Sequence, residues 1–346
     1  MPPEPVPFVS VVVPIRNEGR TIARRLDGLL AQDYPADRTE ILVVDGASDD
    51  GTPDVVAAIA ARASRIRLLH NPDRHAASAM NVGIAAARGE IVARVDGHAI
   101  VPPDFLSRCV AALDRRPDVE CVSGVLETRG RTTTGRAIAA AMSSAAGVGP
   151  ARFRTGASAE VLVDTVAFPV YRRTTLARLG PFDEELVRNQ DDELNLRLTR
   201  AGGRILLLPD VRIVYFCQST LAGLARQYFQ YGFWKVRVIQ KHRRAASWRH
   251  LVPGALVGAL AGVPLVATAV PALRVPALAV VSTYVLALVG AALRLGREHG
   301  IALAPRIAAA LAILHLAYGA GFWKGLATFT LARPARPTPA PVATGR

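Results

Sequence analysis

Residues 89–103 read GEIVARVDGHAIVPP, and a short apolar run here leads directly into an aspartate, a glycine and a histidine. The run 90–95 predicts a buried strand that ends by presenting Asp96 and His98. In an extended chain, residues i and i+2 point to the same side, so both side chains can converge on one ion. A site formed by a carboxylate and an imidazole suits Mg²⁺ or Mn²⁺ better than a site formed by thiolates does. The alternative is a polar strand end in an ordinary turn.

Strand patterns and helix patterns alternate through the first hundred residues. Short β-branched runs at 8–15, 40–44 and 66–70 precede the strand at 90–95, and helical spacing fills the segments between them. This alternation predicts an α/β fold with a mostly parallel sheet and helices on both faces. Such sheets bind ligands at the carboxyl ends of their strands, where Asp45 and Asp96 both fall.

The loops after the first two strands exclude the common nucleotide motifs. No Gly-x-Gly-x-x-Gly follows the first strand and no P-loop sequence occurs, which argues against the dinucleotide and P-loop folds. Instead, Pro14-x-x-Asn17-Glu18 follows the first strand and Asp45-Gly-Ala-Ser48 follows the second. A carboxylate at a strand end can accept hydrogen bonds from a base or a ribose hydroxyl, so these loops are candidates for holding a nucleoside.

Together, these motifs make residues 1–240 resemble an inverting glycosyltransferase of family 2, with the GT-A fold for nucleotide-diphospho-sugars. The resemblance implies nucleoside contacts at Pro14, Glu18 and Asp45. Asp96 and His98 stand where the family has its Asp-x-Asp metal site, so the resemblance also implies a divalent cation and a donor contact at Asp96. The histidine departs from the commonest motif and is similar to a subset of succinoglycan-type glucosyltransferases, which leaves the identity of the metal open.

Two further residues match the donor-side segment of the family. Arg74 lies in Asn71-Pro-x-Arg74, and Asn81 lies in Ser78-x-x-Asn81-x-Gly83. The resemblance implies that both contact the donor. A helix-capping or turn role for Asn81, and a solvated surface position for Arg74, are the alternatives.

The stretch 189–202 supplies the second carboxylate. It resembles the family's Glu-Asp-x-Asp-Leu-x-x-Arg motif and implies that Asp191 is the catalytic base, with Gln190 in place of the usual glutamate. In an inverting transfer the acceptor hydroxyl loses its proton as it attacks, and one positioned aspartate can take it. Asp192 is the competing assignment by a one-residue slip. An acidic helix N-terminus explains part of the same pattern.

Composition points to a membrane rather than to nucleic acid. The 346 residues carry a net charge of +14 and are 51% hydrophobic, and the apolar residues crowd into 251–331 behind a basic stretch at 235–249. No nucleic-acid-binding motif accompanies the charge, whereas basic residues beside apolar segments suit an anionic membrane face. Three cysteines, all far apart, argue against a disulfide framework or a structural zinc site.

The C-terminal third predicts membrane attachment. We expect a catalytic domain at 1–220, a basic and aromatic interfacial helix at 221–250, about three spanning helices within 251–331, and a disordered tail at 332–346. A plain surface helix is the alternative for 221–250. The uncharged runs are 251–273, 277–293 and 307–323. The proline-rich start does not show a signal-peptide pattern, so we expect the first part of the chain to stay in the cytoplasm, and the basic cluster should face the cytoplasm as well. Residues 128–159, rich in small side chains, are expected to be mobile or to face the acceptor.

These features predict a metal-dependent hexosyltransferase in the inner (cytoplasmic) membrane, with its catalytic domain in the cytoplasm. We expect it to move a sugar from a UDP-sugar to a lipid-linked or polysaccharide acceptor in exopolysaccharide or cell-envelope glycan synthesis. Other polysaccharide-assembly proteins would then be partners. A polyprenyl-phosphate sugar transferase and an inactive scaffold of a polysaccharide-export complex are the alternatives.

Overall fold

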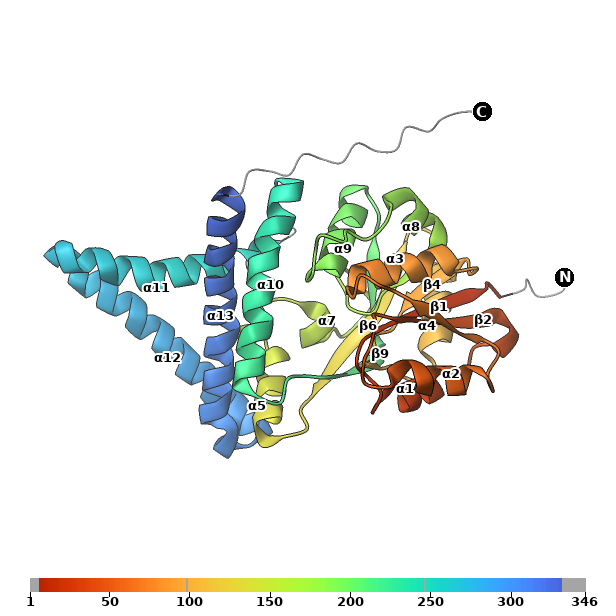
Figure 1. Cartoon of the computed structure of the whole chain (residues 1–346). Coiled ribbons are helices and arrows are strands. Elements are labelled where there is room, and N and C mark those ends of the chain that lie inside the picture. The colour runs from red at the N-terminus through yellow and green to blue at the C-terminus, as the bar shows by residue number, and fades with distance from the viewer. Residues whose placement is uncertain (1–5, 98, 246, 332–346) are drawn as a thin grey trace, which may run out of the picture.

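The computed structural model describes residues 6–97, 99–245 and 247–331. Its first half is a parallel sheet in the order β3-β2-β1-β4, buried by helices on both faces (Figure 1). The β-branched runs form these strands because buried parallel strands favour such side chains. Their bounds are β1 (Val9–Ile15), β2 (Thr39–Asp45), β3 (Ile66–His70) and β4 (Ile91–Arg94). The alternation of strands and helices predicted this architecture correctly.

The second half of the sheet is mixed in direction. β8 joins β4 to β6 by antiparallel pairing, β6 runs parallel to β9, and the short strands β5 and β7 pair antiparallel with β9. β9 therefore carries the chain from the sheet towards the C-terminal helices. These strands are β5 (Ala99–Ile100), β6 (Cys121–Arg129), β7 (Val161–Val163), β8 (Val170–Arg172) and β9 (Ile205–Phe216).

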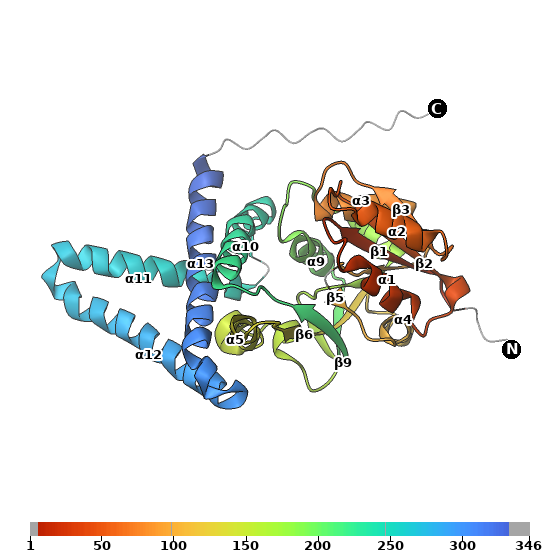
Figure 2. The ribbon, with the colours of Figure 1, turned by 60° about the horizontal axis from the view of Figure 1, so that its bottom comes forward.

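Alternate strand residues face two hydrophobic clusters. Val11 and Val13 pack in one cluster with α1, α2 and α4, whereas Val12 and Val44 pack in the other with α3, α8 and α9. Figures 1 and 2 show these two helix layers on opposite faces of the sheet. The helices are α1 (Ile22–Leu30), α2 (Thr52–Ala60), α3 (Ala76–Ala86), α4 (Phe105–Arg115), α8 (Arg173–Leu179) and α9 (Gln190–Arg200), and η1 (Ala36–Arg38) is a 3₁₀ turn.

Residues 128–159 are more ordered than their composition suggests. They end β6 and form α5 (Thr133–Met142), α6 (Ala145–Val148) and α7 (Arg152–Thr155). Ile138 and Met142 of α5 are buried in the core, so the expectation of a mobile segment is wrong for this part. Its small side chains allow α5 to pack closely against a C-terminal helix, which a search for large apolar residues does not detect.

Four long helices follow β9 in the part of the chain that the structure describes. Three are long and apolar enough to cross a membrane, and two of these extend well beyond the uncharged runs expected at 277–293 and 307–323. They are α10 (Leu221–His242), α11 (Val252–Ala269), α12 (Arg274–His299) and α13 (Ala304–Leu331), with the 3₁₀ turns η2 (Trp248–His250), η3 (Pro271–Leu273) and η4 (Ile301–Leu303) between them. The predicted domain bounds stay a prediction, and the tail at 332–346 lies outside the described residues.

Two glycines let α10 and α13 run side by side (Figure 1). A Cβ on Gly232 would lie 1.9 Å from the backbone oxygen of Tyr318, and one on Gly321 would lie 2.0 Å from that of Phe229. Both distances are shorter than any real contact, so the two backbones approach as closely as they do only because these positions lack a side chain.

Candidate active site

The loops after β1 and β2 form one interlocked edge. Asp45 ends β2, and its carboxylate accepts hydrogen bonds from the hydroxyl of Ser48 at 2.5 Å and from the Ser48 backbone N–H at 3.0 Å. The Ser48 hydroxyl oxygen in turn accepts from the backbone N–H of Asn17 at 2.8 Å. Pro14 is buried one residue before the end of β1 and faces Val44 across the sheet. These contacts hold the two predicted nucleoside loops against each other.

Glu18 links this edge to the end of β4. Its backbone N–H donates to the hydroxyl of Thr52 at 2.9 Å, and its carboxylate accepts from the hydroxyl of Thr21 at 3.2 Å. A Cβ on Gly97 would lie 2.8–2.9 Å from the Glu18 carboxyl group. Glycine at this position therefore allows the Glu18 carboxylate to lie directly beside the segment that follows Asp96.

The two other predicted donor contacts differ in their surroundings. Arg74 is exposed in the loop before α3, with a positive φ of 60°. The Asn81 side chain donates to the backbone oxygen of Phe182 at 3.0 Å and to Glu184 at 2.7 Å, and its own oxygen accepts from the Phe182 N–H at 2.8 Å. These bonds use both ends of the amide, which favours the turn role that the sequence left open for Asn81.

One buried arginine connects the predicted metal ligand Asp96 to the predicted base Asp191. Arg94 in β4 is 4% exposed, and its Nε and Nη2 donate to the two carboxylate oxygens of Asp96 at 2.6 and 3.0 Å. Its Nη1 donates to the Asp191 carboxylate at the start of α9. Asp96 and Asp191 are thus brought together from distant parts of the chain. The sequence analysis missed Arg94, although a charge inside a buried strand signals an ion pair.

These contacts set the protonation of the pair. Burial raises the pKa of Asp191, and the Arg94 guanidinium opposes that rise. Burial also works against the charged form of Arg94, but Asp191 and Asp96 outweigh it and raise the pKa of Arg94 above its ordinary value. A carboxylate with raised proton affinity, held in position by a permanent cation, is suited to accept a proton.

Asp192 points to a different partner. Its carboxylate forms an ion pair with the ammonium group of Lys235, which lies on α10 and is only 4% exposed. The adjacent Glu193 is bound by Arg197 at 2.9 Å and by His242 at 2.8 Å. The three consecutive acids at the start of α9 therefore face three different sets of partners, and Asp191 shares Arg94 with Asp96.

Two carboxylates, those of Asp96 and Glu18, lie near the end of β4, where a metal site was predicted. Among the residues that the structure describes, no three histidine, cysteine or acidic side chains cluster as a complete metal site. His98 lies outside the described residues. Asp96 and the nearby Glu18 carboxylate are hard oxygen donors, and Mg²⁺ or Mn²⁺ is commonly held by one or two carboxylates plus substrate phosphates. The residues present fit such an ion.

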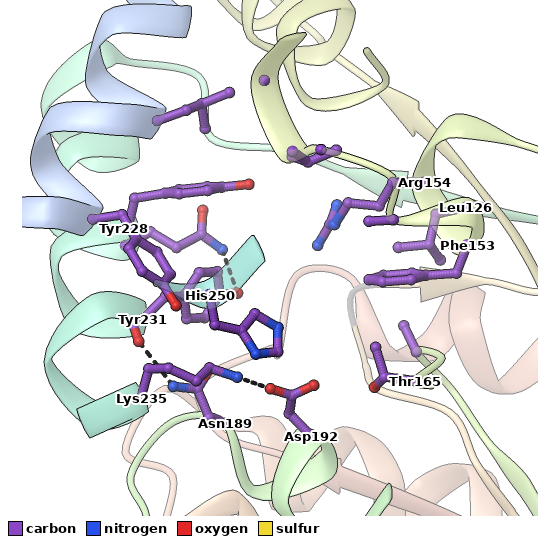
Figure 3. A pocket seen from close by; sticks show the side chains of 18 of the residues that line it. Leu126, Phe153, Arg154, Thr165, Asn189, Asp192, Tyr228, Tyr231, Lys235 and His250 are labelled. Atoms are coloured by element: carbon purple, nitrogen blue, oxygen red, sulfur yellow. Dashed lines mark hydrogen bonds and ion pairs between the residues drawn. The ribbon is translucent and has the colours of Figure 1, made fainter. Parts of the chain in front are cut away.

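A cavity of about 880 Å³ extends from this centre to the C-terminal helices (Figure 3). Its lining includes Arg94, Asp96 and Asp191 together with residues of α10, α13 and the start of α11. The segment from α6 to α7, which is part of 128–159, forms a side wall of this cavity, and its predicted role in facing the acceptor stays a prediction. Neither the cavity nor its C-terminal wall was foreseen from the sequence.

Comparisons with known proteins identify relatives over most of the chain. The family model described as Glycosyl transferase family 2 matches residues 10–179. The succinoglycan biosynthesis protein ExoA of Rhizobium meliloti (strain 1021) is 31% identical, over 92% of this chain and 95% of that protein. A dolichyl N-acetyl-alpha-D-glucosaminyl phosphate 3-beta-D-2,3-diacetamido-2,3-dideoxy-beta-D-glucuronosyltransferase of Methanococcus voltae is 27% identical, over 68% of this chain and 74% of the relative.

A solved structure shares the same arrangement. The mannosyltransferase PcManGT from Pyrobaculum calidifontis, in complex with GDP-Man and Mn²⁺, is similar with a TM-score of 0.64 and 28% sequence identity. The match covers 90% of this chain and 87% of the other. Together with the family model, this likeness confirms the predicted GT-A fold with its C-terminal apolar helices.

Proposed function

This chain belongs to glycosyltransferase family 2, and on that premise we propose that it moves a sugar from a nucleotide-diphospho-sugar to a lipid-linked or polysaccharide acceptor, with inversion. The less specific statement, that this chain is a glycosyltransferase of polysaccharide biosynthesis, follows from the relatives alone. The observation that supports the more specific proposal is a pair of contacts made by Arg94, whose buried guanidinium binds both Asp96 and Asp191.

The mechanism assigns a different task to each carboxylate. The acceptor oxygen forms a bond to the anomeric carbon while the bond from that carbon to the diphosphate oxygen breaks, and the hydroxyl proton passes to the carboxylate of Asp191. Arg94 orients that carboxylate and favours its ionised form before the transfer. Asp96, with His98, would hold the divalent cation, which would neutralise charge on the departing nucleoside diphosphate.

The donor lies against the edge formed by Glu18, Asp45 and the end of β4 in this proposal. The solved relative binds GDP-Man with Mn²⁺, which supports a nucleotide-sugar and a divalent cation here too. We keep the expectation of a UDP-sugar, with Arg74 near the donor. Asp45 is 3% exposed and already accepts two hydrogen bonds, so it would act mainly by shaping the loop that contacts the nucleoside.

The acceptor side rests on the apolar helices and on the cavity beside them. The three candidate spans support attachment to the cytoplasmic membrane, with the catalytic domain in the cytoplasm. The archaeal relative is named for transfer to a dolichyl-phosphate-linked sugar, which supports a lipid-linked acceptor. The second candidate function is transfer to a polyprenyl phosphate that carries no sugar. The two functions are distinguished by offering each acceptor in the assay below.

The test is sugar transfer by the purified full-length chain in detergent. UDP-, GDP- and TDP-sugars are offered with Mn²⁺, with Mg²⁺ and with EDTA, using a lipid-linked glycan extract or polyprenyl phosphate as the acceptor. We expect one donor to be consumed, with transfer to the glycan extract and loss of turnover in EDTA. Turnover that resists EDTA would overturn the metal role of Asp96. Turnover of no donor with either acceptor would overturn the proposal in favour of a scaffold.

A further inference from the structure

The cavity wall contains an unusual concentration of polar atoms without partners. Among the described residues, four of its lining side chains have a buried nitrogen or oxygen atom that makes no hydrogen bond. A buried polar atom left unpaired costs about 1–3 kcal/mol, so folded proteins keep few of them unless something else satisfies them. The atoms are Nη1 of Arg154, Oε1 of Gln227, Nδ1 of His250 and the hydroxyl oxygen of Tyr318.

Arg154 gives this wall its charge preference. It extends into the cavity from α7, opposite His250 and Tyr228 (Figure 3). Its guanidinium lies 5.2 Å from the ring centre of Phe153 and 5.6 Å from that of Tyr215. No ion pair of Arg154 occurs within the described part of the chain, whereas two other cations of the wall, Lys235 and Arg249, are paired with Asp192 and Asp164. The unfilled donor therefore favours an anion.

The position of these atoms narrows the chemistry of the ligand. The cavity wall includes Asp191, where the proposed function places the reacting hydroxyl, and apolar side chains of Val252, Pro253 and Leu314 from α11 and α13. A volume of about 880 Å³ has room for more than one sugar-sized group. A ligand that complements this wall carries a hydroxyl, an anionic group and an apolar chain.

We propose that this cavity holds the phosphate-bearing head of a membrane-anchored acceptor, with Arg154 and Tyr318 donating to its phosphate oxygens. Gln227 is placed to accept from a hydroxyl of the sugar that the phosphate carries. This assignment rests on the proposed function, because it takes the acceptor hydroxyl to lie at Asp191. It adds the class of the acceptor and the residues that hold it.

The experiment measures binding of geranylgeranyl diphosphate to the full-length chain in detergent. Binding is detected as a change in the fluorescence of Trp248, which lines the cavity. Geranylgeraniol tests the need for the anion, and inorganic diphosphate tests the need for the lipid. We expect saturable quenching that Trp248→Phe abolishes, at least tenfold weaker binding of the alcohol and of inorganic diphosphate, and about tenfold weaker binding in Arg154→Gln.

The matched control is Arg152→Gln, since Arg152 is an exposed arginine on the same short helix and does not line the cavity. Tyr318→Phe is a second variant that removes one hydroxyl, and we expect about threefold weaker binding. Equal affinity in Arg154→Gln, Tyr318→Phe and Arg152→Gln would overturn the proposal, as would equal binding of the alcohol or of inorganic diphosphate. Donor turnover assayed in parallel separates this failure from failure of the proposed function.

A second, independent observation concerns the membrane helices. The most apolar 18-residue stretch of each candidate span differs in how far it is buried. It is 11% buried in the span with α11 and in the span with α12, and 33% buried in the span with α13. Large exposed apolar side chains such as Leu265, Leu278 and Leu286 line the first two helices. In α13, Ile307, Leu311 and Leu314 are instead buried in the core shared with α5.

The arrangement of the helices sets α13 apart as well. In both views the hairpin of α11 and α12 projects away from the rest of the molecule, and α13 runs across its base alongside α10 (Figures 1 and 2). α10 is basic, and its Lys235, Arg237 and Lys241 form ion pairs with acids of the catalytic part. If α13 crossed a bilayer, the adjacent α10 would have to enter the bilayer with it. Each of these charged side chains would then cost about 2.5–3.5 kcal/mol at the bilayer centre.

We infer that only the α11–α12 hairpin crosses the bilayer, and that α10 and α13 lie along its surface. The 18 residues of α11 have a length of about 27 Å, close to the thickness of the hydrocarbon core. The end of α13 then lies on the same side of the membrane as the catalytic domain. This replaces the three spans expected from composition, and it does not depend on what the enzyme transfers.

The test is labelling of single cysteines in whole cells with a maleimide that cannot cross membranes. The native Cys109, Cys121 and Cys217 are buried, and the new positions are exposed: Asp27 in the catalytic domain, Ala272 at the hairpin tip and Thr330 near the end of α13. We expect Ala272→Cys to be labelled in intact cells, and Asp27→Cys and Thr330→Cys only after lysis. Labelling of Thr330→Cys together with Ala272→Cys would overturn the inference, as would protection of all three.

Discussion

The donor edge and the acceptor side of this site use carboxylates in opposite ways. On the donor edge, Asp45 is bound by Ser48, three residues away in the chain. On the acceptor side, Asp191 is bound by Arg94, 97 residues away, and Asp192 by Lys235 on another helix. The donor edge therefore rests on contacts within and between the neighbouring loops after β1 and β2, whereas the acceptor side exists only once more distant elements have packed.

The largest effect should come from Asp191→Asn. The amide keeps the shape of the side chain but cannot take the acceptor proton, so we expect kcat to fall by about 10³-fold while donor affinity stays within about twofold. Steady-state transfer and equilibrium binding of the donor measure the two quantities. The matched control is Asp192→Asn, for which we expect kcat within about tenfold of the wild type. An equal loss in both variants would remove the distinction between these neighbouring acids.

A loss of stability should follow from Lys235→Met. Removing the ammonium leaves the carboxylate of Asp192, whose side chain is 18% exposed, without its partner, and we expect unfolding to become easier by about 3 kcal/mol. Thermal unfolding in detergent gives the comparison. Lys241→Met breaks a more exposed pair and should cost less than about 1 kcal/mol.

The double variant Lys235→Met with Asp192→Asn sharpens this result. Neutralising the abandoned carboxylate should restore part of the lost stability, so the combined change should be smaller than the sum of the single changes. Additive losses would mean that Lys235 stabilises α10 by packing alone. The acceptor side would then not depend on a long-range ion pair.

The same contrast explains how far the sequence could be interpreted. Strand and helix periodicity predicted the parallel half of the sheet, and motifs at strand ends marked Asp45 and Asp96 because such motifs are contiguous. Arg94 lies only two residues before Asp96, but its contact with Asp191 depends on where α9 docks. The cavity and the close packing of α10 on α13 depend on residues such as Arg154, Gly232 and Tyr318, which no local pattern connects.

Arg94→Gln should weaken the link between the two carboxylates and change the pH dependence. Losing the charge-assisted hydrogen bond to Asp191 should lower kcat by about 10- to 100-fold. Burial raises the pKa of Asp191 and Arg94 opposes the rise, so removing the guanidinium raises this pKa further. Because the base must be ionised, the acid limb of kcat/KM should move to higher pH. An unchanged acid limb would show that Arg94 only fills space.

Ser48→Ala should have the smallest effect and should act on the donor alone. The Ser48 hydroxyl donates to Asp45 and accepts from the backbone of Asn17, so its loss loosens the loop edge without touching Arg94 or Asp191. One hydrogen bond contributes about 1 kcal/mol, which corresponds to about a fivefold rise in the KM for the donor at unchanged kcat. A fall in kcat as large as that of Arg94→Gln would mean that the donor edge also positions the reacting groups. The local and the long-range halves of the site would then act as one unit.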